Sequence, residues 1–194
     1  MNDHHDAEIS RHVRSVESLL EDRGVVDGVQ LDRILDDFLS RGDPVNGKRI
    51  VARAWTDGAF RERLLSDANA AVAELGYAAS GVEPQLLRVV ENTADVHNVV
   101  VCTLCSCYPL RLLGPSPSWY KSEAYRSRVV REPRSVLAEF GYAPPGDIEI
   151  RVWDASAETR YMVLPQRPAG TDDLDEEQLA QLVTRNGMIG TAPV

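Results

Sequence analysis

The sequence predicts an α+β protein, with an N-terminal helical arm followed by a layered α/β/α-type domain made of two helix-plus-hairpin halves. Two observations support this class. Stretches with helical spacing of apolar residues alternate along the chain with short runs of branched apolar residues that are typical of strands. In addition, residues 59–78 and 124–143 align at a constant offset of 65, and two strand-like stretches follow each segment. Such an order of helices and strands buries its apolar faces by packing in layers.

The aligned segments share eight identical positions, although two helices with the same C-terminal capping sequence would also explain part of the match. The identical pairs are Ala59/Ala124, Arg61/Arg126, Arg63/Arg128, Ala73/Ala138, Glu74/Glu139, Gly76/Gly141, Tyr77/Tyr142 and Ala78/Ala143.

The first 45 residues predict two amphipathic helices. Apolar residues recur at helical spacing from Val13 to Leu20 and again from Leu31 to Leu39, and Gly24 and Gly42 follow as stop signals. Two interpretations remain open: a helical hairpin that packs on the main body, or an arm that clasps a partner subunit. We therefore divide the chain into an arm (1–45), a main domain (46–168) and a C-terminal helix and tail (169–194).

The main domain and the tail predict three more helical regions and four strands. Acidic residues at the start of the last helix suit the positive end of its dipole. In chain order, the expected elements are a helix from Asp57 to about Leu75, strands at 86–90 and 99–102, a helical region from Ser122 to Phe140 broken at Pro133, strands at 148–153 and 161–164, and a helix at 175–183.

Composition excludes several classes of function. Hydrophobic residues make up 43% of the 194 residues, as in a folded globular chain, and the net charge is −9. A negative balance argues against a nucleic-acid partner, because phosphate binding needs a basic face. No stretch approaches the ~18 apolar residues of a membrane span, and the N-terminus lacks the basic head and apolar run of a signal peptide. We expect a cytoplasmic protein that binds neither nucleic acid nor membranes.

All three cysteines lie within six residues, at Cys102, Cys105 and Cys107. Inert buried thiols explain this concentration poorly. A zinc site needs a fourth ligand, which His97 could supply, and an iron–sulfur cluster normally needs a fourth cysteine. The alternative is an ion held by these sulfurs and by the backbone.

Backbone amides can complete such a site. The sulfurs of Cys105 and Cys107, with the amide nitrogens of Ser106 and Cys107, close five- and six-membered chelate rings around one ion, and Cys102 can reach an axial position. An amide nitrogen binds a metal only when it is deprotonated, which favours a trivalent ion over Zn²⁺.

The loop and its surroundings resemble the α subunit of nitrile hydratase, and the resemblance extends over most of the chain. Its most specific part is Val-Cys-Thr-Leu-Cys-Ser-Cys-Tyr at 101–108. The other matching segments are Asn-Gly at 46–47, Ala-Arg-Ala-Trp-Thr-Asp at 52–57, Val-Glu-Asn-Thr at 90–93, Trp-Tyr-Lys-Ser at 119–122, Tyr-Arg-Ser-Arg-Val-Val-Arg at 125–131 and Arg-Val-Trp-Asp at 151–154.

The resemblance implies one low-spin Co(III) ion per chain, with Fe(III) as the alternative. Cys102 would be the axial thiolate, Cys105 a sulfinic acid and Cys107 a sulfenic acid, with the amides of Ser106 and Cys107 in the metal plane. Thr103 and Tyr108 match the cobalt form. Cys105 and Cys107 would be catalytic, and their added oxygens would be held by arginines of a β subunit, or of an equivalent pair of smaller chains.

The implied reaction is the hydration of a small-molecule nitrile to an amide by Lewis-acid catalysis. Three candidates for the nucleophile remain: a water activated by the metal, a free water and the Cys107 sulfenate oxygen. A maturation chaperone is a further implied partner.

Substrate choice rests on departures from the family pattern. The usual Tyr-Pro-Trp-Pro after the loop ends here in Leu110 and Arg111, and Glu83 stands where relatives have Gln. With Trp119, these residues are candidates for the substrate pocket, which we expect to accept a bulky heteroaromatic nitrile, as in the three-subunit enzyme that acts on toyocamycin. Surface drift, or repacking against the β subunit, explains the same departures equally well.

Two other functions remain. The related thiocyanate hydrolase carries the same loop in its γ subunit, and Arg111 could help to hold its anionic substrate. Alternatively, the chain is a non-catalytic metal-carrying assembly form that passes between a maturation partner and a catalytic β subunit.

Overall fold

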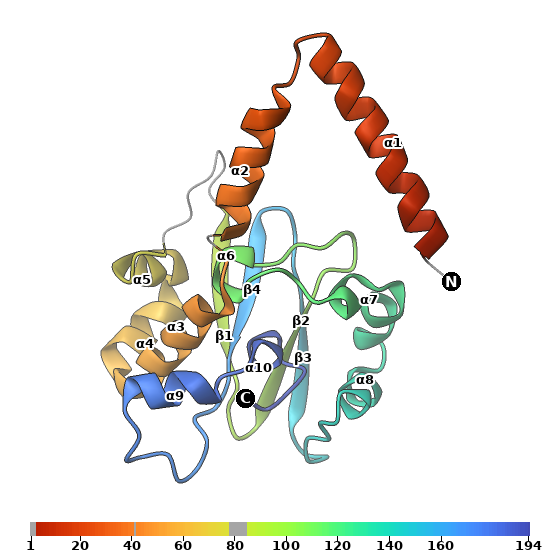
Figure 1. The fold of residues 1–194 in the computed structure, drawn as a ribbon. Coiled ribbons are helices and arrows are strands. Elements are labelled where there is room, and N and C mark those ends of the chain that lie inside the picture. Colours follow the sequence, from red (N-terminus) through yellow and green to blue (C-terminus); the bar gives the residue numbers. More distant parts are fainter. Residues whose placement is uncertain (1–2, 41, 78–84) are drawn as a thin grey trace. The chain divides into compact units, whose positions relative to one another are not determined.

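The computed structural model describes residues 3–40, 42–77 and 85–194 (Figure 1). The chain divides into two compact units, residues 1–41 and 42–194. The second unit contains the three cysteines and all four strands. No helix among the described residues is both long enough and apolar enough to cross a membrane.

The first unit consists of two helices, α1 (Asp3–Asp22) and α2 (Gly28–Ser40), as the sequence predicts. The turn between them needs Gly24, whose φ of 65° lies in the left-handed region that favours glycine. Apolar side chains recur on α1 at helical spacing, and they are about half exposed: Ile9, Val13, Val16 and Leu19. This helix therefore carries an apolar stripe that its own unit does not bury.

Three helices open the second unit: α3 (Pro44–Thr56), α4 (Gly58–Ser66) and α5 (Ala68–Glu74). Helix α3 is not among the helices that the sequence predicts, because a proline after an apolar repeat is typical of a helix end. In the structure, Pro44 is instead the first residue of a helix capped by Asp43. The single helix expected from Asp57 to Leu75 is wrong, since the Asp67 side chain accepts from the N–H of Ala70 and starts a new helix there.

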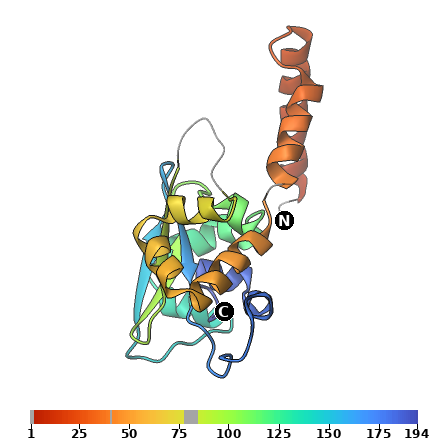
Figure 2. The ribbon, with the colours of Figure 1, turned by 90° about the vertical axis from the view of Figure 1, so that its left-hand side faces the viewer.

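The four strands are β1 (Leu86–Glu91), β2 (Val96–Val101), β3 (Glu149–Asp154) and β4 (Thr159–Leu164). The α+β class is confirmed, but the pairing of consecutive strands as hairpins is wrong. Strand β1 pairs in parallel with β4, and β2 pairs in parallel with β3. Each half thus contributes one strand to both pairs, so the two halves interlock. The strands run between α4 and α5 on one side and α7 and α8 on the other (Figures 1 and 2).

The remaining helices are α6 (Leu110–Leu113), the 3₁₀ turn η1 (Ser118–Lys121), α7 (Glu123–Val129), α8 (Pro133–Glu139), α9 (Glu176–Leu182) and α10 (Arg185–Ile189). The break before Pro133 and the helix α9 are as predicted, whereas α10 is not. The side chains of Asp175 and Gln178 form a capping box at the start of α9.

The internal repeat is present in three dimensions. Helices α7 and α8 follow the pattern of α4 and α5, and β3 and β4 each begin 63 residues after β1 and β2. The bidentate ion pair of Arg63 with Glu74 is repeated by Arg128 with Glu139. The glycines that end α5 and α8, Gly76 and Gly141, share a φ of 82°.

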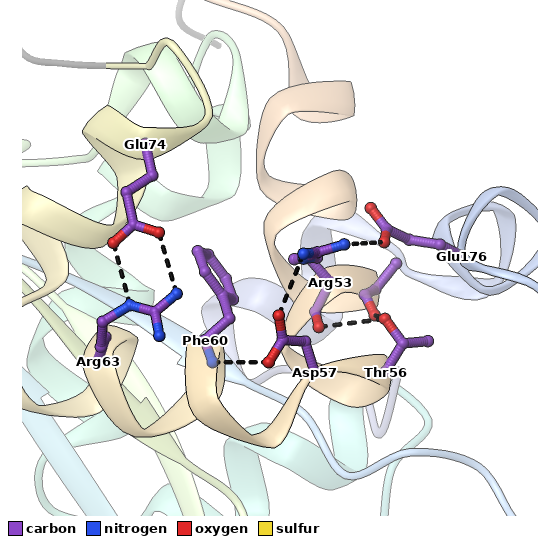
Figure 3. A network of polar contacts seen from close by, with 8 residues as sticks. Arg53, Thr56, Asp57, Phe60, Arg63, Glu74 and Glu176 are labelled. Atoms are coloured by element: carbon purple, nitrogen blue, oxygen red, sulfur yellow. Dashed lines mark hydrogen bonds and ion pairs between the residues drawn. The ribbon is translucent and has the colours of Figure 1, made fainter.

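Polar contacts tie α3 to α4 and to α9, beside the first of these repeated pairs (Figure 3). The Arg53 guanidinium contacts Asp57 at 3.1 Å and Glu176 at 3.3 Å. Asp57 also caps α4 by accepting from the N–H of Phe60. Asp57 therefore ends α3 with its backbone N–H and caps α4 with its carboxylate, which fixes the junction between these two helices.

Candidate metal centre

The cysteine loop begins at the carboxyl end of β2. Val99, Val100 and Val101 are buried, and this fixes the point at which the chain leaves the sheet. Residues 102–109 form the loop, and α6 begins directly after Pro109. The loop is thus held between a buried strand and a short buried helix.

The three cysteine sulfurs converge. The Sγ atoms of Cys102 and Cys105 are 3.5 Å apart, and those of Cys105 and Cys107 are 3.2 Å apart. All three sulfurs lie within 4.8 Å of one another, with Cys102 and Cys107 buried and Cys105 exposed. Three soft donors at one point, open on one side, form a site that can hold a metal ion.

The hydrogen bonds of the loop set the charge state of its thiols. The hydrogen bonds with Cys107 and Cys102, together with the backbone N–H groups of Ser106 and Cys107, lower the pKa of Cys105 to about 7. Burial and the hydrogen bond with Cys105 raise the pKa of Cys107 to about 12. Negative charge therefore resides first on the exposed Cys105.

The same contacts test whether a backbone-chelated ion fits. The backbone N–H groups of Ser106 and Cys107 act on the Cys105 sulfur by lowering the pKa of its thiol, and the Cys105 N–H donates to the Cys102 sulfur at 3.3 Å. A donor set of three sulfurs and two amide nitrogens fits the residues present. The zinc alternative with His97 does not fit. The His97 Nε2 lies 2.7 Å from the carbonyl of Gly190 and its Nδ1 lies 3.2 Å from the Asn92 side-chain nitrogen. His97 is also the second residue of β2, whereas the cysteine loop follows the other end of that strand.

Side chains from two other elements, β3 and α7, hold the loop backbone. The Asp154 carboxylate, at the end of β3, accepts from the N–H of Thr103 at 2.9 Å and from its hydroxyl at 2.5 Å. Arg126 of α7 donates to the carbonyls of Leu104 and Cys105 at 3.3 and 3.2 Å.

A tyrosine secures the end of the loop. The Tyr120 hydroxyl donates to the carbonyl of Cys107 at 3.0 Å. Burial raises the pKa of Tyr120, so this hydroxyl remains a donor. Its ring packs edge-on against Tyr108, which follows the last cysteine. The end of the loop therefore packs on buried aromatic side chains.

Nothing in the sequence patterns identifies Asp154, Arg126 or Tyr120 as supports of the loop. All three lie in segments noted for their resemblance, but the resemblance assigns them no role at the loop. A usable signal existed for Asp154: a carboxylate at the end of one strand lies beside the end of its parallel neighbour, and Val101 pairs with Asp154.

The candidate pocket residues lie in different places. Leu110 opens α6, is half-buried, and its side chain approaches Gly42. Arg111 follows it, and its carbonyl accepts from the Asn46 side chain at 2.8 Å. Trp119 packs edge-on against Tyr125 and Phe140 in the aromatic core. Glu83 lies outside the described residues.

A cavity of about 960 Å³ lies elsewhere, at the amino end of β2. Its lining includes Trp55, His97, Tyr142 and Arg167. The Trp55 indole N–H donates to the carbonyl of Pro165, and Arg167 donates to Thr171. These polar groups are satisfied within the chain, so the cavity offers no converging donors comparable to the cysteine loop.

Comparison with known proteins identifies close relatives. The profile of the family "Nitrile hydratase, alpha chain" matches residues 7–192. The α subunit of a low-molecular-weight cobalt-containing nitrile hydratase from Rhodococcus rhodochrous is 52% identical over 95% of this chain and 88% of its own length. The γ subunit of thiocyanate hydrolase from Thiobacillus thioparus is 43% identical over 82% of this chain and 70% of its own length.

The fold is shared with solved structures of the same group. A double mutant of the Fe-type nitrile hydratase from Comamonas testosteroni Ni1 superposes with a TM-score of 0.88 and 42% identity, over 96% of this chain and 90% of that one. Relatives therefore include proteins described as cobalt-containing and as Fe-type.

Proposed function

The chain belongs to the nitrile hydratase α-chain family, and from this membership we propose that it is the cobalt-bearing α subunit of a nitrile hydratase. With a partner subunit, it hydrates a nitrile to the corresponding amide. The observation that carries the proposal is the convergence of three cysteine sulfurs within 4.8 Å in one loop.

The ligands of the ion are the sulfurs of Cys102, Cys105 and Cys107 and the amide nitrogens of Ser106 and Cys107. When bound, the ion supplies a Lewis acid beside the substrate. Cobalt is favoured because Thr103 and Tyr108 match the cobalt form of the loop, and because the R. rhodochrous relative is described as cobalt-containing.

The residues of this chain fix the conformation of the metal loop and determine which of its sulfurs is exposed. The loop backbone is held by hydrogen bonds with Asp154, Arg126 and Tyr120. These bonds fix the positions of the atoms that would bind the ion. Cys105 is exposed and Cys107 is buried. A sulfinic acid at Cys105 and a sulfenic acid at Cys107 would add oxygens that accept hydrogen bonds from a partner subunit.

Exposed apolar surface supports a partner subunit. Leu104, in the middle of the loop, is 87% exposed, which is unusual for leucine. The stripe of apolar residues on α1 is also exposed. A β subunit, or an equivalent pair of smaller chains, covers these surfaces and completes the pocket, and a maturation chaperone uses the same surfaces before assembly.

The substrate is a bulky heteroaromatic nitrile of the toyocamycin type. Leucine at position 110 replaces the tryptophan of the family pattern directly after the loop, which leaves more room beside the metal site. Arg111, Glu83 and Trp119 are the other candidate pocket residues, and the side-chain contacts of Trp119 within the core make it the weakest of the four.

Product analysis tests the proposal. The chain is produced with its partner subunit in medium containing cobalt, and the complex is given toyocamycin, acrylonitrile and thiocyanate separately. Formation of the amide from a nitrile supports nitrile hydratase. Carbonyl sulfide and ammonia from thiocyanate would instead support thiocyanate hydrolase, which the T. thioparus relative keeps as the second candidate. Transfer of metal without turnover would identify an assembly form.

Mass spectrometry tests the centre itself. In the peptide that spans residues 101–110, a gain of about 32 Da on Cys105 and about 16 Da on Cys107 corresponds to two added oxygens and one. Cobalt at one ion per chain, with these two gains, is the expected composition. Unmodified cysteines in an active cobalt complex would contradict the oxidised centre.

A further inference from the structure

We infer that Arg126 is a positioning residue which applies a positive charge to the carbonyl side of a metal-binding peptide group. The inference rests on the proposed function, because it concerns the peptide between Cys105 and Ser106. Its starting point is the contact of Arg126 Nη1 with the carbonyls of Leu104 and Cys105, at 3.3 and 3.2 Å.

The Cys105 carbonyl and the Ser106 nitrogen belong to the same peptide group. The electrons of a peptide are shared between nitrogen and oxygen, which is the reason for its planarity. When the Ser106 nitrogen binds an ion, it does so as an anion, and part of the negative charge is carried by the Cys105 oxygen. A guanidinium that donates to this oxygen therefore stabilises the ligand form of the peptide by a charge-assisted hydrogen bond.

The same hydrogen bond tunes the ion. Charge drawn toward the carbonyl oxygen leaves the Ser106 nitrogen a weaker electron donor. An ion with a weaker donor in its plane is a stronger Lewis acid, so a cation on the far side of the peptide favours the chemistry of the site. Arg126 achieves this without occupying a coordination position.

The internal repeat gives an independent observation. Arg61 is the counterpart of Arg126, and it makes a bidentate ion pair with Glu91, at 2.5 and 2.6 Å. Arg126 makes no ion pair with any described residue, and its guanidinium contacts loop carbonyls instead. Its Nε is the only buried side-chain nitrogen or oxygen without a hydrogen-bond partner in the described part of the chain.

A buried donor without a partner costs folding free energy. The arginine at this repeated position thus lacks the carboxylate partner of its counterpart, and its Nε has no hydrogen-bond partner beside the metal loop. This is expected of a side chain placed for the function of the loop rather than for the stability of the helix.

The test compares Arg126→Gln, Arg126→Lys and a matched control, Arg131→Gln. Arg131 is an exposed arginine just beyond the same helix, and its Nε donates to the Ser127 carbonyl, away from the loop. Each variant is produced as the cobalt-loaded complex with its partner subunit. Two properties are measured: the wavelength of the sulfur-to-cobalt charge-transfer absorption, and the half-time of cobalt loss to an excess of chelator.

We expect Arg126→Gln to absorb at shorter wavelength than the wild type, because a stronger nitrogen donor raises the energy of the accepting metal orbital. Its cobalt should be lost at least about tenfold faster, because the anionic peptide lacks the cation that stabilises it and its nitrogen takes up a proton more readily. Arg126→Lys keeps the charge, so it should restore the wild-type absorption, and Arg131→Gln should match the wild type in both properties.

An unshifted absorption in a cobalt-loaded Arg126→Gln complex would overturn the inference and leave the proposed function intact. If that variant holds too little cobalt for a spectrum, the lysine variant decides. Wild-type cobalt content and absorption in Arg126→Lys would support the role of the charge, and a deficit equal to that of the glutamine variant would overturn it. Absence of the cobalt absorption from the wild-type complex would overturn both proposals.

Discussion

The Asp154 carboxylate holds Thr103 by two hydrogen bonds, one from the backbone N–H at 2.9 Å and one from the hydroxyl at 2.5 Å. These residues are 51 positions apart, and the parallel pairing of β2 with β3 brings them together by setting Val101 opposite Asp154. Because Thr103 follows Cys102, the anchor fixes the first ligand of the loop. The register of the β2–β3 pair thus determines which side chain anchors the metal loop.

Replacing Asp154 with asparagine should weaken metal binding. The amide oxygen can still accept from the Thr103 N–H, but its NH₂ group cannot accept from the hydroxyl. Residues that orient metal ligands typically contribute about 10–100-fold in affinity. We therefore expect Asp154→Asn to bind cobalt at least about tenfold more weakly, as measured by competition with a chelator. Asp147→Asn, an exposed carboxylate before β3, is the control; equal affinities for the two variants would contradict the prediction.

Replacing Leu110 with tryptophan should change substrate choice. Leu110 begins α6 directly after the loop, and if it lines the substrate pocket as proposed, a larger side chain reduces the space for the substrate. We expect kcat/KM for toyocamycin to fall at least about tenfold and that for acrylonitrile to change less than about threefold, since poor fit in a pocket excludes the larger substrate. Leu110→Met, which keeps the volume, is the control. A parallel fall for both nitriles would indicate general disruption of the loop instead.

His97 should make the stability of the chain sensitive to acid. Burial lowers its pKa, although the hydrogen bond to the Gly190 carbonyl opposes the shift. The unfolded chain therefore takes up a proton at a higher pH than the folded chain, and stability falls as the pH decreases below about 6.5, with a slope of up to about 1.4 kcal/mol per pH unit. Above that pH the contribution is fully present.

Urea unfolding of the full chain at pH 7.5, 6.5 and 5.5 measures this slope. In His97→Gln the carboxylates that also titrate are unchanged, so the difference in slope between wild type and variant belongs to His97. We expect the variant to lose less free energy of unfolding than the wild type between pH 7.5 and 5.5. Identical losses would show that His97 does not carry the effect.

Local chemistry could be predicted from the sequence, and long-range contacts could not. The metal loop was predictable because the spacing of Cys102, Cys105 and Cys107 limits which chelate rings can close. The strands were recognisable from their branched apolar residues, but each pairs with a segment 73 or 53 residues further along the chain. A hairpin prediction was natural for neighbouring strands, and the parallel pairs of β1 with β4 and β2 with β3 overrode it.

The supports of the loop were missed for the same reason. Arg126 and Tyr120 lie 21 and 13 positions from the carbonyls of Cys105 and Cys107 that they contact. The helix start at Asp57 is confirmed, but the break at Asp67, which ends α4 and caps α5, was missed. That break follows from backbone angles, which the apolar periodicity of the sequence does not reveal.

A pair of glycine substitutions tests how closely the end of α10 approaches β2, the strand that leads to the cysteine loop. Gly190 has a φ of 90°, and a Cβ built there would lie 1.9 Å from the carbonyl oxygen of Asn98 in β2. Gly170 has a φ of 75°, but a Cβ there would meet nothing within 4 Å. Alanine at either position bears the left-handed strain of about 1–2 kcal/mol, and only Gly190→Ala adds overpacking, typically about 1–3 kcal/mol.

The difference between the two variants therefore isolates the contact. We expect urea unfolding to show a larger loss of free energy for Gly190→Ala than for Gly170→Ala, by about 1–3 kcal/mol. The clash also displaces the carbonyl that accepts from His97 and the strand that leads to Cys102. Gly190→Ala should consequently retain less cobalt than Gly170→Ala. Equal stability and equal cobalt content in the two variants would mean that β2 tolerates movement of α10 without effect on the loop.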